Sequence, residues 1–307
     1  MQPQPSLDDL FELAEQLRGT ALRDRGVEFV EEKVRALVAG YAPIGVGRTA
    51  EQIWYRARKC GMDGYSNVRE LLYPPNGAPD FGRAQRPGSK VLYASWNIAT
   101  ALDEVAAQPG DHIQVLVVRP HAGIHIPCHI VGEYRHFFNS GRSILASNTV
   151  ERELTARAMA DPERFRRCAF VDSVIADFFA KPVKRPFEYK VSAIYSELLH
   201  QGDGGIIYPS VESIVGMNLA VPARTFDAKF EAVFTKVVYV NRAYGHGIFD
   251  LPDVRYTEGL SAEGLFDWTA APFRSFRFTP ERGYIEEPYV PGWRINQHAA
   301  PKETPSK

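Results

Sequence analysis

The chain has 307 residues, a formal net charge of −1 and 45% hydrophobic residues, the composition of a folded globular protein of one large or two small domains. Its basic residues are scattered, and no apolar run approaches the roughly 20 residues of a membrane span, so we expect no direct binding of nucleic acid and no membrane insertion. The N-terminus lacks the basic start and apolar core of a secretory signal, and the three cysteines are odd in number and widely spaced, which fits a cytoplasmic protein.

Two helices are predicted first, over residues 6–19 and 27–39, because apolar residues recur at helical spacing in both. Ser6, followed by two acidic residues, is typical of a helix start. The stretch 40–49 is rich in glycine and predicts a turn. We therefore expect residues 1–47 to form an N-terminal helical extension.

The central part, residues 48–245, mixes strand and helix patterns. Strand patterns cover residues 91–95, 113–119, 205–210 and 231–240, and helix patterns cover residues 148–180 and 187–200. Strands at both ends with helices between them favour an α+β fold over a regular βαβ repeat. Residues 246–307 are rich in Pro, Gly and aromatic residues, and we expect a C-terminal extension with a disordered end.

Two arginines, Arg83 and Arg86, lie among glycines in the turn GRAQRPG. Guanidinium groups and exposed backbone amides together can hold a pyrophosphate. The spacing matches neither a P-loop nor a G-x-G-x-x-G turn, and the local sequence by itself favours solvated turn residues.

The strand VLYAS follows this turn, and alternation places Val91, Tyr93 and Ser95 on one of its faces. If that face lines a cleft, the ring of Tyr93 can stack on a planar base. The commoner interpretation of such a tyrosine is a core residue.

A helix is predicted next, capped by Asn97 or Thr100 and carrying two acids, Asp103 and Glu104. Neighbouring residues point in different directions on a helix, so only one of these carboxylates reaches the same cleft as the strand. The alternative is that both belong to a solvated helix surface.

Ser210 ends the stretch GDGGIIYPS, where an apolar strand follows a glycine-rich turn. A serine at a strand end is well placed to bond a ribose or a phosphate. It could also be a nucleophile with His200 as its base, but there is no G-x-S-x-G elbow and no obvious third member of a triad.

Three histidines, His121, His125 and His129, occur with Cys128 in HAGIHIPCH and raise the question of a metal site. Pro127 makes a helix unfavourable there, and no fourth ligand cluster with zinc spacing occurs elsewhere. Ordinary strand histidines are the favoured interpretation, so we expect no metal.

Taken in order, WYRAR (54–58), GRAQRPGSKVLYAS followed by TALDEV, and GGIIYPSV resemble the RES-domain family, named for its Arg, Glu and Ser. The resemblance covers roughly residues 53–222. It implies a fold similar to that of ADP-ribosyltransferases, with a split β-sheet core and flanking helices. Family members that are toxins of toxin–antitoxin pairs destroy NAD+, and their partner is an Xre-like helix-turn-helix antitoxin.

The family positions fall on this chain at Arg56 or Arg58, Arg83, Tyr93, Glu104 and Ser210. The resemblance implies that the arginines hold the pyrophosphate and that Tyr93 helps to bind the dinucleotide. Glu104 would stabilise the cationic ribose or orient an attacking water or phosphate, and Ser210 would fix the ribose or nicotinamide side. Where family members commonly have an aromatic residue and Asn after the turn arginine, this chain has Ala84 and Gln85.

The resemblance therefore implies an NAD+-consuming enzyme, a glycohydrolase or phosphorylase, with NAD+ as its substrate and no separate cofactor. Two alternatives stay open: a protein ADP-ribosyltransferase, and a non-catalytic protein that binds a nucleotide or a partner. The two extensions have three candidate roles, which are covering the cleft, forming a homo-oligomer and docking an antitoxin.

Overall fold

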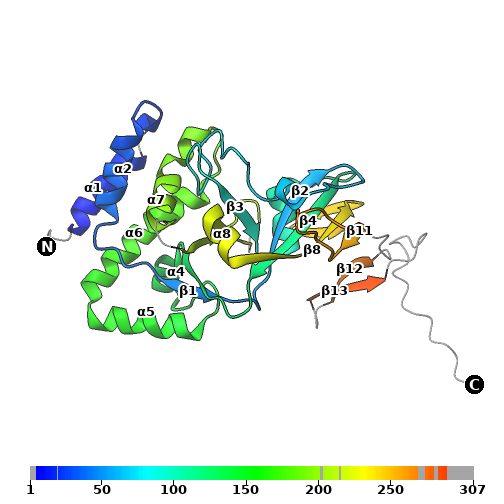
Figure 1. Cartoon of the computed structure of the whole chain (residues 1–307). Helices are drawn as coiled ribbons and strands as arrows, with labels where there is room; N and C mark the ends of the chain where they lie inside the picture. The colour runs from blue at the N-terminus through cyan, green and yellow to red at the C-terminus, as the bar shows by residue number, and fades with distance from the viewer. Residues whose placement is uncertain are drawn as a thin grey trace, which may run out of the picture.

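The computed structural model describes residues 5–18, 20–200, 203–213, 216–268, 274–279 and 283–288 (Figure 1). Its helices are α1 (Leu7–Arg18), α2 (Val27–Leu37), α3 (Ile98–Glu104), α4 (Glu133–Ser140), α5 (Asn148–Ala160), α6 (Pro162–Ala180), α7 (Lys190–His200) and α8 (Ala223–Lys229), with 3-10 turns η1 (Thr20–Arg23), η2 (Val68–Glu70) and η3 (Pro186–Tyr189). Its strands are β1 (Gly45–Arg48), β2 (Trp54–Cys60), β3 (Val91–Ser95), β4 (His112–Pro120), β5 (Ile126–Ile130), β6 (Gly205–Pro209), β7 (Met217–Pro222), β8 (Phe230–Tyr239), β9 (Arg242–Gly245), β10 (Ile248–Asp250), β11 (Asp253–Thr257), β12 (Arg274–Thr279) and β13 (Gly283–Pro288).

Within the described residues, nine strands form one mixed sheet in the order β1-β5-β6-β7-β3-β2-β4-β8-β11. The pairing between neighbouring strands is shortest between β2 and β3, where the described strands pair at one position, Tyr55 opposite Ser95. By contrast, β3 pairs with β7 along its whole length, and so does β2 with β4. The sheet thus consists of two halves joined at one residue pair. The predicted α+β class, with helices flanking a split sheet, is confirmed.

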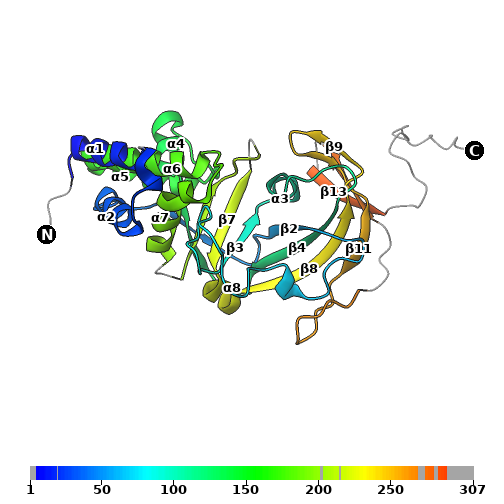
Figure 2. The same cartoon turned by 90° about the horizontal axis from the view of Figure 1, so that it is seen from above.

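Helices flank both halves of the sheet, with α6 and α7 against β6 and α3 against β2 and β3 (Figure 2). On the half that contains β3, α6 and α7 pack against Val91 and Ala220, and α1 and α2 lie outside them. On the other half, α3 buries Leu102 against Val115 of β4. Because α3 contacts both β2 and β3, its C-terminal end lies beside the junction between the halves.

The helix pattern over residues 148–180 corresponds to two helices, not one. The break falls at Asp161, whose carboxylate accepts a hydrogen bond from the backbone amide of Arg164 at 2.9 Å and caps α6. Pro162 follows at the first helical position, where its missing N–H leaves no hydrogen bond unmade. A capping residue followed by proline therefore starts a new helix here.

Segments on both sides of the central region add strands to the sheet that the sequence does not predict. The predicted turn at residues 40–49 contains β1, which pairs with β5 as an edge strand. The C-terminal extension contributes β11, which pairs with β8 at the other edge. The predicted disordered end of the chain lies outside the described residues.

The N-terminal helical extension is tied to the rest of the protein by charged groups as well as by apolar packing. Glu31 of α2 forms an ion pair with Arg86 of the glycine-rich turn at 2.7 Å. The buried ammonium of Lys190 donates hydrogen bonds to the carbonyls of Leu22 at 2.9 Å and Arg25 at 2.8 Å. The extension therefore holds both the start of α7 and the turn that carries Arg83.

His129 is a buried strand histidine whose two ring nitrogens both have partners. Nδ1 donates to the carbonyl of Ile44 at 2.9 Å, and Nε2 accepts from the hydroxyl of Tyr195 at 2.7 Å. Burial lowers the pKa of His129 from 6.5 to about 4. The ring is therefore neutral at physiological pH.

Replacing His129 with Gln is expected to flatten the acid side of the stability profile. Between its ordinary pKa of 6.5 and about 4, His129 binds a proton in the unfolded chain but not in the folded one. Stability of the wild type should fall as pH falls through this window, by up to about 1.4 kcal/mol per pH unit relative to the variant. Urea denaturation at several pH values between neutral and acidic measures the difference. Parallel profiles for the two proteins would contradict the assignment.

Candidate functional site

Glu104 is the last residue of α3, and the sequence of this helix directs its carboxylate toward the sheet junction. Asn97 caps the helix by accepting a hydrogen bond from the amide of Thr100 at 2.8 Å, so Asn97 and not Thr100 is the cap. Ile98 and Leu102 are buried and anchor one side of the helix. The exposed carboxylate of Glu104 is thereby held at the end of a fixed element.

A chain of hydrogen bonds connects Glu104 with both neighbouring strands. Its Oε1 accepts from the hydroxyl of Ser210 and from the side-chain amide of Asn218, each at 2.6 Å. The amide oxygen of Asn218 in turn accepts from the hydroxyl of Ser95 at 2.7 Å. Ser95 and Asn218 face each other in the β3–β7 register, so the sheet itself sets this geometry.

Ser210 directly follows β6, and its hydroxyl is oriented from two sides. It donates to Glu104 and accepts from the backbone amide of Ser213 at 3.0 Å. The side chain of His200, the candidate base of a serine nucleophile, lies outside the described side chains. Because Ser210 donates its hydroxyl hydrogen to the carboxylate of Glu104, we interpret Ser210 as a residue that holds Glu104 in position.

Two tyrosines, the buried Tyr208 and the partly buried Tyr93, lie next to each other and form the floor beside Glu104. The hydroxyl of Tyr93 accepts from the backbone amide of Ala84 at 2.9 Å, and burial raises the pKa of Tyr93 above its ordinary value. Burial also raises the pKa of Tyr208. The nearby Tyr93 and Glu104 raise this pKa further, and Arg83 lowers it. Both phenols therefore stay protonated, and Tyr208 lies within electrostatic reach of Glu104 and Arg83.

The guanidinium of Arg83 is partly engaged by the protein. Nη1 donates to the carbonyl of Phe179 near the C-terminal end of α6, and the guanidinium stacks over the ring of Tyr189 with 5.1 Å to the ring centroid. The structure thus brings Arg83 to the floor formed by the two tyrosines. Arg83 is held by its hydrogen bond to α6, whereas the local sequence by itself favoured a solvated turn residue.

The other two arginines lie on β2. The partly buried Arg56 donates to the carbonyl of Tyr93 at 2.9 Å and to that of Leu71, and loss of solvent around its guanidinium lowers its pKa to about 10. It therefore occupies the space where β2 and β3 diverge. Arg58 donates to the carbonyl of Glu70 at 2.5 Å, further from the junction. The geometry favours Arg56 over Arg58 as the arginine of the site.

A model of the RES domain matches residues 53–237, more than half of the chain. The chain belongs to the RES-domain family. The resemblance predicted from the motifs is confirmed. No curated protein and no solved structure matches the chain significantly.

The matched RES domain contains all the predicted site residues, and the structure brings most of them together. Glu104 and Ser210 are in direct contact, and Tyr93 and Arg83 lie around the same floor. The N-terminal helices and the strands after β8 lie outside the match.

Sequence reasoning missed two residues of this site in the RES domain. Asn218 was missed because β7 itself was not predicted, and only its pairing with Ser95 and Tyr208 places it under Glu104. A signal did exist for Tyr208, since strand alternation places it on the same face as Ser210.

The histidine cluster does not form a metal site in the described part of the chain. There, no group of three or more His, Cys, Asp and Glu side chains is placed to hold a metal ion. None of the described helices combines the length and apolarity needed to cross a membrane.

Changing Asn218 to Asp is expected to destabilise the RES domain in a pH-dependent way. The substitution keeps the acceptor for Ser95 but turns a carboxylate oxygen toward Glu104 at the 2.6 Å position of the present hydrogen bond. We expect a loss of about 1–3 kcal/mol at slightly alkaline pH. The loss should shrink in mild acid, because like charges raise the pKa of one carboxyl until the pair shares a proton.

Urea denaturation measures this effect, with Asn241→Asp as the matched control. Asn241 also donates to a carboxylate, Asp250, at 2.6 Å, but on the exposed surface. We expect less than about 1 kcal/mol there. Equal losses at the two positions would show that the buried chain through Asn218 has no special role.

Proposed function

We propose that this protein is an NAD+-consuming enzyme that cleaves the bond between nicotinamide and ribose, as a glycohydrolase or a phosphorylase. The observation that carries the proposal is the way in which the carboxylate of Glu104 is held within a RES domain. Its carboxylate is exposed, yet Ser210 and Asn218 hold it at 2.6 Å each. Such a group is fixed in position and still accessible to a substrate.

The two oxygens of Glu104 have different surroundings. Both hydrogen bonds from Ser210 and Asn218 end on Oε1, while Oε2 accepts no hydrogen bond from the described residues. Loss of nicotinamide from NAD+ leaves positive charge on the ribose, and a fixed carboxylate beside that charge lowers the barrier. In this proposal Oε2 faces the ribose and stabilises the cation or orients the attacking water or phosphate.

The remaining groups suit the rest of the dinucleotide. Arg83 and Arg56 both carry positive charge close to Tyr93, which matches a pyrophosphate. The protonated phenol of Tyr208 and the hydroxyl of Ser210 supply polar contacts for the ribose or the carboxamide of nicotinamide. NAD+ is the substrate here, and the proposed reaction needs no further cofactor.

The biological part of the proposal rests on family membership alone. We propose that the protein acts in the cytoplasm as a toxin whose consumption of NAD+ is neutralised by an Xre-like antitoxin protein. Co-purification with such a protein and its effect on NAD+ loss would test this part separately from the chemistry.

Replacing Glu104 with Gln is expected to slow NAD+ loss by about 100-fold or more, because the amide keeps the shape of the side chain and removes its charge. Purified protein is incubated with NAD+, with and without phosphate, and nicotinamide, ADP-ribose and its phosphorylated form are resolved. The neighbouring acid on the same helix supplies the control, and Asp103→Asn is expected to retain most of the activity.

Three results would overturn or redirect this proposal. Equal rates for Glu104→Gln and the wild type would remove Glu104 from the chemistry. Folded wild type that leaves NAD+ intact would exclude hydrolysis and phosphorolysis. ADP-ribose added to a protein, seen as an increase in intact mass, would identify transfer as the reaction.

Replacing Arg83 with Ala is expected to weaken NAD+ binding by about tenfold or more, because a guanidinium that faces the pyrophosphate contributes charge-assisted hydrogen bonds. Calorimetric titration of NAD+ into Glu104→Gln protein measures the affinity without turnover. Arg152→Ala, which removes an exposed guanidinium on α5, serves as the control. Unchanged affinity in folded Arg83→Ala protein would place the pyrophosphate elsewhere.

A further inference from the structure

The first helix, α1, lies at the outer edge of the protein and carries an exposed apolar stripe (Figure 1). The stripe consists of Leu7, Phe11 and Arg18, which share one side of the helix because they are four and eleven residues apart. Leu7 is 40% exposed and Phe11 is 54% exposed. The residues that α1 buries against the rest of the protein are Leu10, Ala14 and Leu17. The α1 stripe is therefore left over after α1 has packed onto α2 and α6.

A cavity of about 580 Å³ lies at the Arg18 end of the α1 stripe. Its walls come from α1, η1, α4, the end of α6 and η3. Leu22 and Phe178, each 8% exposed, and Phe187 form its apolar part. Because Arg18 also lines it, the cavity continues the α1 stripe. An apolar hollow surrounded by charged side chains has the anatomy of a protein–protein interface.

The charges around this cavity are balanced. Three cations and three carboxylates form exposed ion pairs at or beside its rim: Arg18–Glu15 at 3.2 Å, Arg18–Asp177 at 3.2 Å, Arg135–Asp177 at 2.7 Å and Lys181–Glu188 at 3.7 Å. Exposed pairs of this kind contribute little energy, so they can rearrange when another surface docks. A balanced rim selects no strongly acidic or strongly basic ligand, and it fits a surface that also carries both signs.

The charge order along α1 makes this segment complementary to a copy of itself. Acidic residues lie in the helix, and arginines lie at its end and just beyond it: Asp8, Asp9, Glu12 and Glu15, then Arg18, Arg23 and Arg25. Two copies of α1 packed antiparallel place the acidic part of each beside the basic end of the other. Parallel packing would instead place like charges together.

The same antiparallel arrangement matches the apolar residues. When the two helices cross between positions 14 and 15, Phe11 of one copy faces Arg18 of the other, about 10 Å along the helix from its own Arg18. Leu7 then faces Leu22, at the apolar wall of the cavity. An aromatic ring beside a guanidinium adds a cation–π attraction. Each contact occurs twice around a twofold axis, as in an isologous dimer.

We propose that the α1 stripe and this cavity bind a second copy of the chain. In this homodimer the two α1 helices pack antiparallel, and Leu7 and Phe11 of each copy cover the cavity of the other. The contact lies outside the matched RES domain on α1 and borders the end of α6, where the carbonyl of Phe179 holds Arg83. It does not depend on the proposed reaction.

Sedimentation velocity of the full chain over a wide range of micromolar concentrations tests the proposal. We expect the mass of a dimer for the wild type. Leu7→Glu should weaken the dimer about tenfold or more, because it places a charge against the apolar wall. Met159→Glu changes an apolar side chain of α5 that is 80% exposed, and it should leave the dimer unchanged. Circular dichroism verifies the fold of each variant.

Two opposite charges at position 11 test the antiparallel arrangement. Phe11→Lys places a cation opposite Arg18 of the other copy, whereas the carboxylate of Phe11→Glu can pair with that arginine. We expect the dimer of Phe11→Lys to be about tenfold or more weaker than that of Phe11→Glu. In a parallel dimer position 11 would face itself, and both charges would repel equally.

Three results would overturn the proposal. They are a wild type that stays monomeric at every concentration, a dimer that neither Leu7→Glu nor Phe11→Lys weakens, and equal effects of the two charges at position 11. A monomeric wild type that binds a different protein through Leu7 and Phe11 would assign this surface to that partner instead. The measurement uses no nucleotide, so its outcome is independent of the assay for loss of NAD+.

Discussion

The whole site depends on the junction between β2 and β3, where Ser95 has two roles. Its backbone forms the pair with Tyr55 that joins the two halves of the sheet. Its hydroxyl begins the hydrogen-bond chain through Asn218 to Glu104. Because both roles start from one residue of a paired strand, the position of the carboxylate is fixed relative to both halves. A shift of one residue in the β3–β7 register would turn Ser95 to the opposite face and break the chain.

Backbone carbonyls hold both arginines of the site. Arg56 fills the space where the strands diverge and Arg83 holds the end of α6, each through hydrogen bonds to backbone carbonyls. A partly buried guanidinium benefits from such acceptors, since an unpaired charge away from water is costly. The same tethers keep the positive charge beside Tyr93 and Tyr208, where the proposed pyrophosphate would bind. Stability and proposed binding therefore rest on the same contacts.

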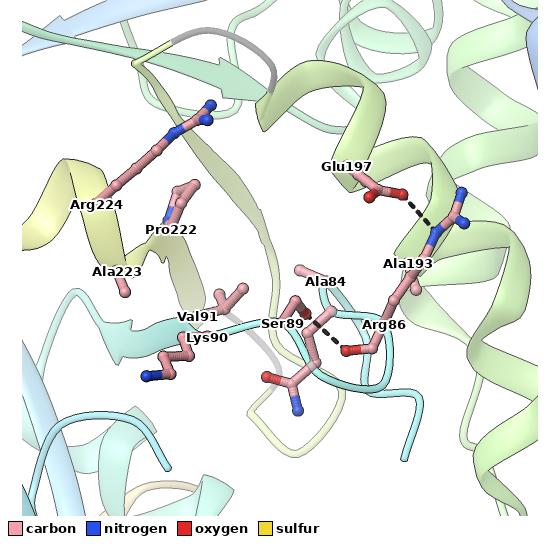
Figure 3. Close-up of a pocket in the computed structure, with 11 residues that line it drawn as sticks. Ala84, Arg86, Ser89, Lys90, Val91, Ala193, Glu197, Pro222, Ala223 and Arg224 are labelled. Atoms are coloured by element: carbon pink, nitrogen blue, oxygen red, sulfur yellow. Dashed lines mark hydrogen bonds and ion pairs between the residues drawn. The ribbon is translucent and has the colours of Figure 1, made fainter. Parts of the chain in front are cut away.

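The N-terminal extension and α7 both hold the turn that carries Arg83. Glu197 of α7 pairs with Arg86 of this turn (Figure 3), and so does Glu31 of α2, so this part of the turn is fixed before any ligand binds. The extension also packs against the helix that holds Arg83, because α1 contacts α6. It therefore supports Arg83 in two ways, through the turn and through the helix that accepts its hydrogen bond.

The sequence by itself determined the α+β class, the helices of the extension, the strand and helix that carry Tyr93 and Glu104, and the family, because local periodicity, capping residues and ordered motifs carry that information. It did not determine β1, β7 or β11, since short edge strands and a strand after a loop are stabilised by partners distant in the chain. Asn218 and Tyr208 could be assigned to the site only from strand register. Only the tertiary structure decided that Glu104 rather than Asp103 contacts Ser210, that Arg83 is tethered to α6, and that the exposed stripe of α1 ends at a cavity formed with α4 and α6. Each of these depends on contacts between residues far apart in the chain, which no local pattern records.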